Sequence, residues 1–523
     1  MPRLKITQMI ALPSASSSFG AFLLFLLFAT PQSPSQAQEK SPETTPKTEE
    51  KDPKKEEKPK ERSGQISLGG SEIKYLAQTG TIPVFKDDGA VKADVFYVYY
   101  AATGPNGKRL STHPGNSRPI TFCFNGGPGA SAVWLHLGGL GPRRLDFPPE
   151  GLSPSTVCRI VDNPNSILDA TDLVFVDPVS TGLSRAAKGE KPEQFFGIDE
   201  DIAAVGEFVR LFTTREQRWT SPKFFLGESY GATRVSGLVG YLQQKHGLFA
   251  DGLILMSGLI NFGTLNADAG NDLPFILYLP TLTATAHYHK KLSPDLLGDL
   301  DQTIAESRRF AQTDYAVALL KGATLPIEDR RSIASKLARF TGLTAEQILE
   351  QNLRIDPAFF RKALLKSEGK IIGRFDARVT GEDGDPGDPL PAYDPSFSNI
   401  VGGFASAVNA YIRTELNFEV DHPYHVLNGV PWKWSAFEGR YVSTEDRLAY
   451  ALRTNPRMRV LVLAGRRDLA VPEDSMRYSL DHLTLPASVR KNISTSLYES
   501  GHMMYLLRSD AEKLRADLLR FLK

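Results

Sequence analysis

Apolar residues along the chain form two kinds of short segment, and each kind predicts a different type of strand. Between residues 70 and 100 the segments are separated by Gly and Asp turn signals, which indicates an antiparallel β start. Later segments are short and continuously apolar, as expected for strands covered on both faces. The predicted early strands are residues 72–77, 81–86 and 95–100, and the predicted later strands are residues 119–124, 172–176, 223–226, 252–256 and 459–463.

Helical patterns lie between the later strands, notably at residues 198–212 and 232–244. Strands that alternate with helices argue for the α/β class, with a mostly parallel, doubly wound sheet. The alternation stops from residue 261 to residue 457. Helix-like stretches replace it there, at residues 294–319, 327–340 and 344–351. The predicted organisation is therefore a core in two parts, residues 65–260 and 458–523, with a largely helical cap inserted at residues 261–457.

The N-terminal segment has a different pattern, which predicts export. Two basic residues precede an apolar run at residues 19–29 and a small-x-small cleavage site at residues 35–37. Residues 1–37 are therefore a predicted signal peptide that leaves no stable membrane span after cleavage; an uncleaved membrane anchor is the alternative. Residues 38–64 are rich in Lys, Glu, Pro and Thr and predict a disordered linker. Either way, we expect the folded part in the periplasm or outside the cell.

The composition argues against nucleic-acid binding and against a metal or cofactor site. The chain of 523 residues has 61 basic and 60 acidic side chains, so no broad field favours nucleic acid. No Cys or His cluster has metal-ligand spacing, and the Asp-rich segment 381–395 lacks the spacing of an EF-hand loop, so we expect no cofactor or metal. Cys123 and Cys158 can form one disulfide or remain buried thiols. The sequence does not indicate the oligomeric state.

The segment Gly227-Glu228-Ser229-Tyr230-Gly231 lies between a predicted strand and a predicted helix. A strand that turns sharply into a helix with a strained serine needs very small residues at the flanking positions. This context favours a nucleophile elbow, with Ser229 as the nucleophile.

A serine nucleophile needs a base and an orienting acid, and this type of sheet has them in the order Ser, acid, His. Asp468 follows the strand at residues 459–463, and His502 precedes a terminal helix that Ser509 is expected to cap. Each residue also has a purely structural interpretation: Asp468 can pair with a neighbouring Arg, and His502 can be an ordinary core or surface group. The order and context favour a triad in an α/β-hydrolase fold, in which His502 takes the Ser229 proton and Asp468 orients the imidazole.

A glycine-rich loop, Asn125-Gly126-Gly127-Pro128-Gly129, follows the predicted strand at residues 119–124. Such a loop can aim backbone N–H groups at a developing oxyanion. We expect the N–H groups of Gly127 and Tyr230 to form the oxyanion hole.

Together with Gly465 to Asp468 and Gly501-His502-Met503, these motifs resemble the serine carboxypeptidase family, peptidase S10. The resemblance runs from about residue 70 to the C-terminus. It implies the same triad and oxyanion hole, and it implies that Asn125 and Glu228 bind the terminal carboxylate of a peptide. A protonated Glu228 can donate a hydrogen bond to that carboxylate, whereas an ionised one repels it, so we expect an acid optimum.

The chain departs from the pattern of well-studied family members at several positions. Cys123 replaces a Trp, and Gly139 stands, by ungapped count, where a second Glu completes the carboxylate site. Ala130 replaces a Cys of the family. His136 is expected on a helix surface, and Arg234 is expected to form an ordinary salt bridge rather than bind a substrate carboxylate.

The leading hypothesis is an exported serine carboxypeptidase whose partner is a peptide with a free C-terminus. An esterase, an acyltransferase or another serine peptidase on the same scaffold is the alternative, and an inert binding protein is a third possibility. Several aromatic residues pack in the core or line the substrate pocket, and the sequence does not say which. They are Tyr278, Tyr424, Trp432 and Trp434.

Overall fold

A ten-stranded mixed sheet is the central element of the computed structural model, which describes residues 58–112, 118–151, 159–434 and 437–523. The predicted signal peptide, most of the predicted linker and Cys158 lie outside the described residues. Within the described ranges, no helix is both long enough and apolar enough to cross a membrane.

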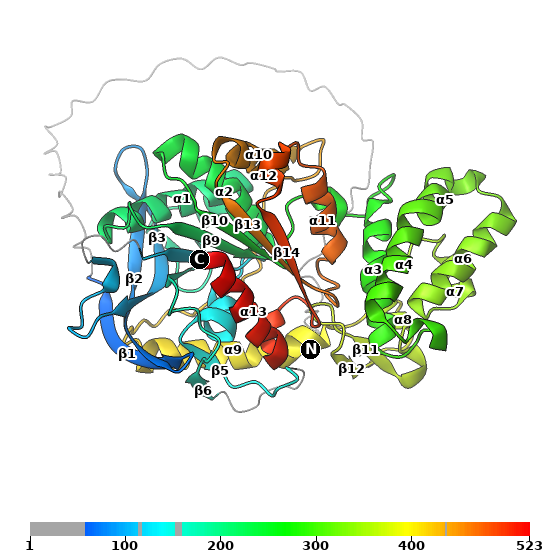
Figure 1. Ribbon diagram of the computed structural model, residues 1–523, viewed down its shortest axis with the longest axis horizontal. Coiled ribbons are helices and arrows are strands. Elements are labelled where there is room, and N and C mark those ends of the chain that lie inside the picture. Colours follow the sequence, from blue (N-terminus) through cyan, green and yellow to red (C-terminus); the bar gives the residue numbers. More distant parts are fainter. Residues whose placement is uncertain (1–57, 113–117, 152–158, 435–436) are drawn as a thin grey trace, which may run out of the picture. The chain divides into compact units, whose positions relative to one another are not determined.

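The sheet has the order β1-β2-β3-β7-β4-β9-β10-β13-β14, with the short β8 paired to β3 (Figure 1). Pairs from β1 to β7 are antiparallel, and pairs from β7 to β14 are parallel. This confirms the predicted α/β class with an antiparallel start. The strands are β1 (Lys60–Leu68), β2 (Ser71–Phe85), β3 (Val91–Thr103), β4 (Ile120–Phe124), β7 (Asp172–Val176), β8 (Arg185–Ala186), β9 (Lys223–Glu228), β10 (Gly252–Met256), β13 (Arg459–Gly465) and β14 (Ile493–Tyr498).

Several details of the sheet differ from the sequence prediction; among them, β1 and β8 were not expected as strands. Residues 72–77 and 81–86 were expected as separate strands, but β2 runs through both because Gly80 pairs with Tyr97 of β3 instead of making a turn. β14 was not expected. It is the last strand of the sheet and most of its residues are half-buried or exposed, so it lacks the continuous apolar run of a covered strand.

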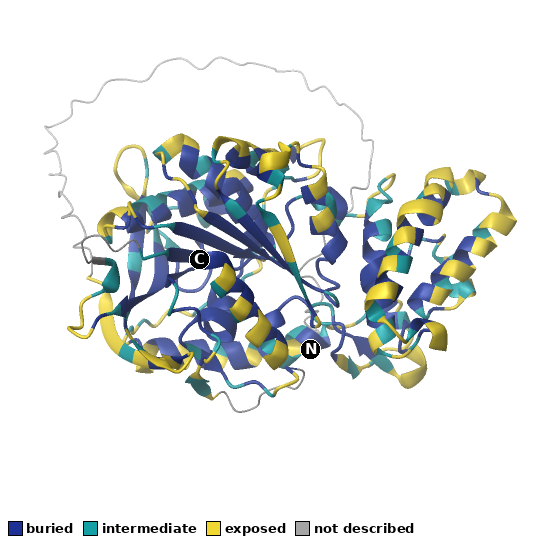
Figure 2. Ribbon diagram, viewed as in Figure 1, coloured by how far each residue is buried: buried dark blue, intermediate teal, exposed yellow. Residues whose placement is uncertain are grey.

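Helices cover both faces of the sheet, as the predicted double winding requires (Figures 1 and 2). One apolar core lies between the sheet and the group α1, α2, α10, α11 and α12, and the other lies between the sheet and the group η2, α9 and α13. The helices are α1 (Ile198–Arg215), α2 (Tyr230–His246), α10 (Glu445–Thr454), α11 (Glu473–Asp481), α12 (Ala487–Arg490), the π-helix η2 (Trp134–Leu140), α9 (Pro395–Thr414) and α13 (Arg508–Leu522).

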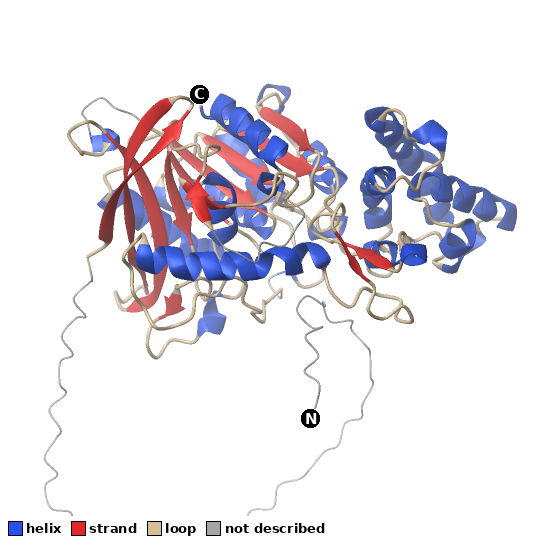
Figure 3. Cartoon of the chain, turned by 90° about the horizontal axis from the view of Figure 1, so that it is seen from below, coloured by secondary structure: helices blue, strands red, loops and turns tan. Residues whose placement is uncertain are grey.

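The inserted block between β10 and β13 packs in two ways. Its first helices enclose an apolar core of their own, whereas α9 and α10 pack against the central sheet's helices and cores. Figure 3 shows α9 as the long helix lying across the sheet. The boundaries predicted for the cap stay a prediction. The remaining elements of the block are α3 (Leu273–Tyr288), α4 (Leu300–Phe310), α5 (Ala316–Lys321), α6 (Ile327–Thr341), α7 (Ala345–Glu350), α8 (Pro357–Ala363), β11 (Lys370–Ile372) and β12 (Thr380–Glu382).

Two local helix predictions differ from the structure. Of the helix-like stretch expected at residues 294–319, Pro294–Leu296 form a separate 3₁₀ turn, and the helix begins only at Leu300 and continues from α4 through a π-helical turn into α5. Ser509 was expected to cap the terminal helix, but α13 begins at Arg508, so Ser509 lies inside its first turn and no side chain caps the helix.

Candidate active site

The predicted nucleophile lies in a sharp turn between β9 and α2. Ser229 separates Glu228 from Tyr230 and has a φ of 61° and a ψ of −127°. Non-glycine residues rarely adopt this conformation, which costs about 1–3 kcal/mol and persists only where the surroundings enforce it. A Cβ atom at Gly227 would overlap the carbonyl oxygen of Gly231, so the turn tolerates no larger side chain at residue 227. Ser229 is partly exposed between two buried neighbours, as a nucleophile requires.

The predicted base and acid form a buried pair. His502 Nδ1 and Asp468 Oδ2 are 2.6 Å apart, and both side chains are almost fully buried. The other oxygen of Asp468 accepts the backbone N–H groups of Ala470, at 2.8 Å, and Val471, at 2.9 Å. Burial opposes the charged imidazolium, but the Asp468 carboxylate outweighs it and raises the pKa of His502 above its usual value. This is the geometry in which an acid orients a histidine base.

Hydrogen bonds at the carboxyl ends of four strands bring these groups to one edge of the sheet. The Ser229 N–H donates to the Met256 carbonyl at 3.0 Å, and the next residue, Ser257, donates its N–H to the Leu463 carbonyl at 2.7 Å. The Ser257 hydroxyl donates to the His502 carbonyl at 2.8 Å. The nucleophile turn, the strand before the acid and the loop of the base are therefore linked, while the catalytic roles of the three residues stay a prediction.

The glycine-rich loop after β4 lies against the first turn of α2. A Cβ atom at Gly126 would be 2.5 Å from the backbone nitrogen of Tyr230 and 2.9 Å from that of Gly231, so only glycine allows this approach. Gly127 has a φ of 99°, a conformation that favours glycine. Helix N-terminal amides bind anions, and the loop adjoins these amides. The oxyanion hole predicted from Gly127 and Tyr230 is compatible with this arrangement and stays a prediction.

The two residues expected to bind a carboxylate are in contact. The Asn125 side chain is hydrogen-bonded to Glu228, and its Oδ1 accepts the Leu135 N–H at 3.1 Å, which leaves its NH₂ group to donate. Glu228 is 2% exposed. Burial raises the pKa of Glu228 to about 7, although the charge of His502 and the hydrogen bonds from Tyr505 and Asn125 favour its ionised form. On the acid side of neutrality, Glu228 is therefore protonated and can donate a hydrogen bond.

Sequence reasoning missed a segment of the inserted block that holds the loops of the predicted acid and base. The Phe375 carbonyl accepts the His502 N–H at 2.6 Å, and the Arg374 carbonyl accepts the Leu469 N–H at 3.0 Å. The Phe375 ring centroid is 5.1 Å from that of His502. The segment joins the loop of the acid to the loop of the base. Because its polar contacts are made by backbone carbonyls, no residue pattern in the sequence marks it.

His136 is buried, so the prediction of a helix-surface position is wrong. It is 3% exposed, its Nε2 lies 2.6 Å from the Tyr100 hydroxyl, and its ring stacks on Phe175 at 4.5 Å. Burial lowers the pKa of His136 to about 3. The π-helix that carries it is enclosed by α9 and the sheet, which the local sequence does not reveal.

Arg234 forms the salt bridge that was expected. Its Nε donates to Asp201 at 2.7 Å, and its Nη1 donates to the Asn125 carbonyl at 2.6 Å. The pair is buried and anchors the first residue of the glycine-rich loop. Arg234 therefore supports the loop that carries Asn125.

Other residues singled out from the sequence have structural positions. Cys123 has a free thiol buried in the core. Trp432 packs edge-on against Tyr230 with ring centroids 5.3 Å apart, and the Tyr278 hydroxyl donates to the Leu469 carbonyl at 3.3 Å. Among the described residues, no group of three or more His, Cys, Asp or Glu side chains is arranged to hold a metal ion.

Comparison with known proteins identifies the family. The family model for peptidase S10, serine carboxypeptidase, matches residues 83–354, which is more than half of the chain. The chain belongs to this family. The matched range includes the glycine-rich loop and the nucleophile turn, whereas Asp468 and His502 lie beyond it. A comparison with curated proteins gives no match.

Solved structures support the α/β-hydrolase fold of this serine carboxypeptidase family member. The prohormone-processing carboxypeptidase Kex1 from Saccharomyces cerevisiae is 16% identical, with a TM-score of 0.52, over 86% of this chain and 91% of that chain. Proline iminopeptidase from Mycobacterium smegmatis is 14% identical, with a TM-score of 0.37, over 85% and 97%. Peroxisomal Lpx1 from S. cerevisiae is 11% identical, with a TM-score of 0.35, over 86% and 89%. At these identities the likeness to Kex1 shows the fold alone, and the two lower scores add nothing to it.

Proposed function

We propose that this protein is an exported serine-type carboxypeptidase that releases C-terminal residues from peptides through an acyl-enzyme on Ser229. The observation that carries the proposal is the buried Glu228, which directly precedes Ser229, contacts Asn125 and has a pKa raised by burial to about 7. A carboxyl group that is protonated in weak acid, and lies one residue from the nucleophile, suits a peptide's terminal carboxylate.

The proposed chemistry uses the predicted triad and oxyanion hole. His502 takes the proton of the Ser229 hydroxyl as Oγ attacks the carbonyl carbon of the last peptide bond. The N–H groups of Gly127 and Tyr230 stabilise the oxyanion. His502 then protonates the leaving amino group, the C-terminal amino acid departs, and water hydrolyses the acyl-enzyme with His502 again as base.

Recognition of the carboxylate sets the expected pH dependence. Below about pH 7 the protonated Glu228 donates to the substrate carboxylate, together with the NH₂ group of Asn125. Above that pH an ionised Glu228 repels the substrate. Activity on free-acid peptides should therefore decline near neutrality, whereas substrates without a terminal carboxylate lose no such interaction.

The test is amino-acid release from N-blocked dipeptides between pH 4 and pH 8, with the Ser229→Ala variant as the blank. We expect the free C-terminal amino acid as the product, and a preference for the free acid over the corresponding C-terminal amide that is larger in weak acid. An enzyme that cleaves esters but releases nothing from any free-acid peptide contradicts the proposal.

A second candidate, an esterase or other acyl-transfer enzyme, is favoured by the replaced positions. Cys123 is buried in the core and Gly139 has no side chain, so neither supplies a polar group to the carboxylate site. Glu228→Gln separates the two functions. A carboxypeptidase should change its pH profile chiefly for free-acid substrates. An equal effect on esters that lack a terminal carboxylate favours the second candidate.

The remaining alternative, an inert binding protein, is tested by labelling with a fluorophosphonate, which reacts with an activated serine. Label on Ser229 that disappears in Ser229→Ala supports an enzyme, and absence of label supports the inert protein. The export proposal rests on residues 1–37. It predicts a mature protein that begins at Gln38 in the exported fraction, which N-terminal sequencing checks.

A further inference from the structure

Tyr505 fills the space beside two glycines of the π-helix η2. It follows His502 by three residues and is 1% exposed. A Cβ atom at Gly138 would lie 2.7 Å from the Tyr505 ring, and one at Gly139 would lie 2.9 Å from it. These contacts are closer than carbon atoms tolerate, so the ring fits only because both positions are glycine. The space beside Gly139 is thus filled by the ring of Tyr505, which comes from the C-terminal part of the chain.

The hydroxyl of this ring reaches the carboxyl group of Glu228. Tyr505 Oη donates to Glu228 Oε2 at 3.0 Å and is 3.2 Å from Oε1. Burial, followed by the nearby Glu228 charge, raises the pKa of Tyr505 well above its usual value, so the hydroxyl stays protonated and acts as a donor. The other groups that act on Glu228 are the charged His502 and Asp468 and the neutral Asn125.

We propose that Tyr505 is a positioning residue of the carboxylate site, which holds the Glu228 carboxyl group and sets the upper pH limit of carboxylate recognition. This inference rests on the proposed carboxypeptidase function. A hydroxyl donor favours the ionised form of a carboxyl group, so Tyr505 lowers the pH at which Glu228 ionises.

Removal of the hydroxyl should have two measurable effects. In Tyr505→Phe the ionised Glu228 loses a donor, so its pKa rises and the alkaline limb of kcat/KM for free-acid peptides moves up by about one pH unit. The carboxyl group also loses its orientation, so KM for these peptides rises about three- to tenfold in weak acid. The kcat for ester substrates without a terminal carboxylate should stay unchanged.

Tyr411→Phe is the matched control. Tyr411 is 2% exposed in the same apolar core, and its hydroxyl is hydrogen-bonded to Tyr100 at 2.7 Å, away from Glu228. The two variants lose the same group from similar surroundings. Only Tyr505→Phe should shift the pH limb for free-acid peptides.

Binding gives a readout that does not depend on turnover. In a Ser229→Ala background, calorimetry compares an N-blocked dipeptide acid with its C-terminal amide at pH 5.5. We expect the parent to prefer the acid, and Tyr505→Phe to reduce this preference about three- to tenfold. Gly139→Ala, which presses on the ring but keeps the hydroxyl, should reduce it in the same direction and serves as the second variant if Tyr505→Phe does not fold.

The outcomes separate the two proposals. A parent protein that binds acid and amide equally overturns the carboxypeptidase function, and the role of Tyr505 with it. If the parent prefers the acid and Tyr505→Phe keeps both this preference and the alkaline limb, the role of Tyr505 alone is overturned. An equal loss on acids and esters also overturns it, because that result indicates only a structural role.

Discussion

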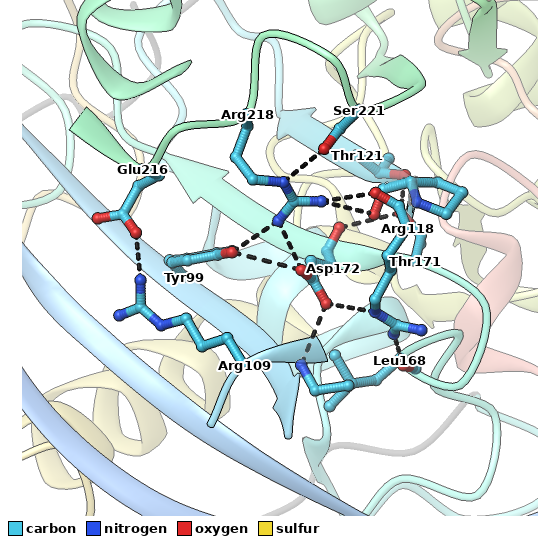
Figure 4. Close-up of polar contacts among 12 residues, drawn as sticks. Tyr99, Arg109, Arg118, Thr121, Leu168, Thr171, Asp172, Glu216, Arg218 and Ser221 are labelled. Atoms are coloured by element: carbon cyan, nitrogen blue, oxygen red, sulfur yellow. Dashed lines mark hydrogen bonds and ion pairs between the residues drawn. The ribbon is translucent and has the colours of Figure 1, made fainter. Parts of the chain in front are cut away.

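Two buried carboxyl groups lie at opposite ends of the parallel strands, and their surroundings differ. The end at which these strands begin is called the amino edge of the sheet, and the end at which they finish is called the carboxyl edge. Asp172 begins β7, and Figure 4 shows Arg118 and Arg218 reaching it from two sides, each at 2.6 Å. It also accepts the Tyr99 hydroxyl at 3.3 Å and the Ala102 N–H at 3.1 Å. Both oxygens of Asp172 are thus satisfied, and two cations compensate its charge.

Glu228, at the end of β9, has hydrogen bonds from the neutral groups of Tyr505 and Asn125, and burial raises its pKa to about 7. A buried charge with bonded cations stays ionised and destabilises the fold when one partner is removed, whereas a buried carboxyl group without a bonded cation is poised to change its protonation state. The contrast predicts that substitutions at the Asp172 ion pairs act on stability, whereas substitutions at the carboxyl edge act on the proposed chemistry.

The largest expected effect is at the carboxyl edge. Asp468→Asn should lower kcat about 10⁴-fold, because an amide donates to His502 Nδ1 and stabilises the wrong tautomer. Steady-state kinetics on a chromogenic ester measures this loss. Asp517→Asn, which alters a buried carboxylate of α13 bonded to Ser496 and Tyr498 of β14, is the control and should keep kcat. A loss of less than tenfold in Asp468→Asn contradicts the triad.

At the amino edge the effect should be on stability. Arg218→Met leaves Asp172 with one of its two cations and should lower the free energy of unfolding by about 3–5 kcal/mol. Urea denaturation measures the loss, and kcat of the folded fraction should be unchanged. Loss of activity without loss of stability in Arg218→Met would contradict a structural role of the amino edge and a catalytic role of the carboxyl edge.

Glu228→Gln should reveal how far ionisation of this buried carboxyl group lowers the free energy of unfolding. Between pH 4.5 and pH 7 the folded protein keeps a proton on Glu228 that the unfolded chain has released, so wild-type stability falls as the pH rises through this window. The variant lacks this titration. Its stability relative to the wild type should therefore increase by up to about 3 kcal/mol from pH 4.5 to pH 7, as measured by denaturation at several pH values. A difference that does not depend on pH contradicts the raised pKa.

The smallest effect should come from an exposed ion pair. Arg159 contacts Asp146 at 2.5 Å, but its side chain is 71% exposed. Arg159→Met should change the free energy of unfolding by less than about 0.5 kcal/mol, because solvent screens such pairs. Urea denaturation in parallel with Arg218→Met gives the baseline. A loss of stability as large as that in Arg218→Met would show that burial does not decide how much these ion pairs contribute.

Local patterns made much of the carboxyl edge predictable. The nucleophile turn is a five-residue motif between a strand and a helix, and its conformation depends on its own glycines. Asp468 and His502 could be inferred because the fold places an acid and a histidine after late strands in a known order. The covered strands were predictable because burial on both faces gives a continuous apolar run.

Features that depend on distant contacts were not predictable. Tyr505 meets Glu228 across 277 positions, and its ring is accommodated by glycines whose spacing has no motif. Phe375 supports His502 through a backbone carbonyl, which every residue possesses. β14 was missed because it is covered on fewer sides, and the surroundings of His136 come from elements far away in the sequence.

The most direct measurement is the ratio of kcat/KM for an N-blocked dipeptide acid to that for its C-terminal amide, between pH 5 and pH 9. If protonated Glu228 recognises the substrate carboxylate, this ratio is high in weak acid and falls with an apparent pKa of about 7, and it no longer follows this titration in Glu228→Gln. A wild-type ratio that stays constant across this range would contradict the role of Glu228.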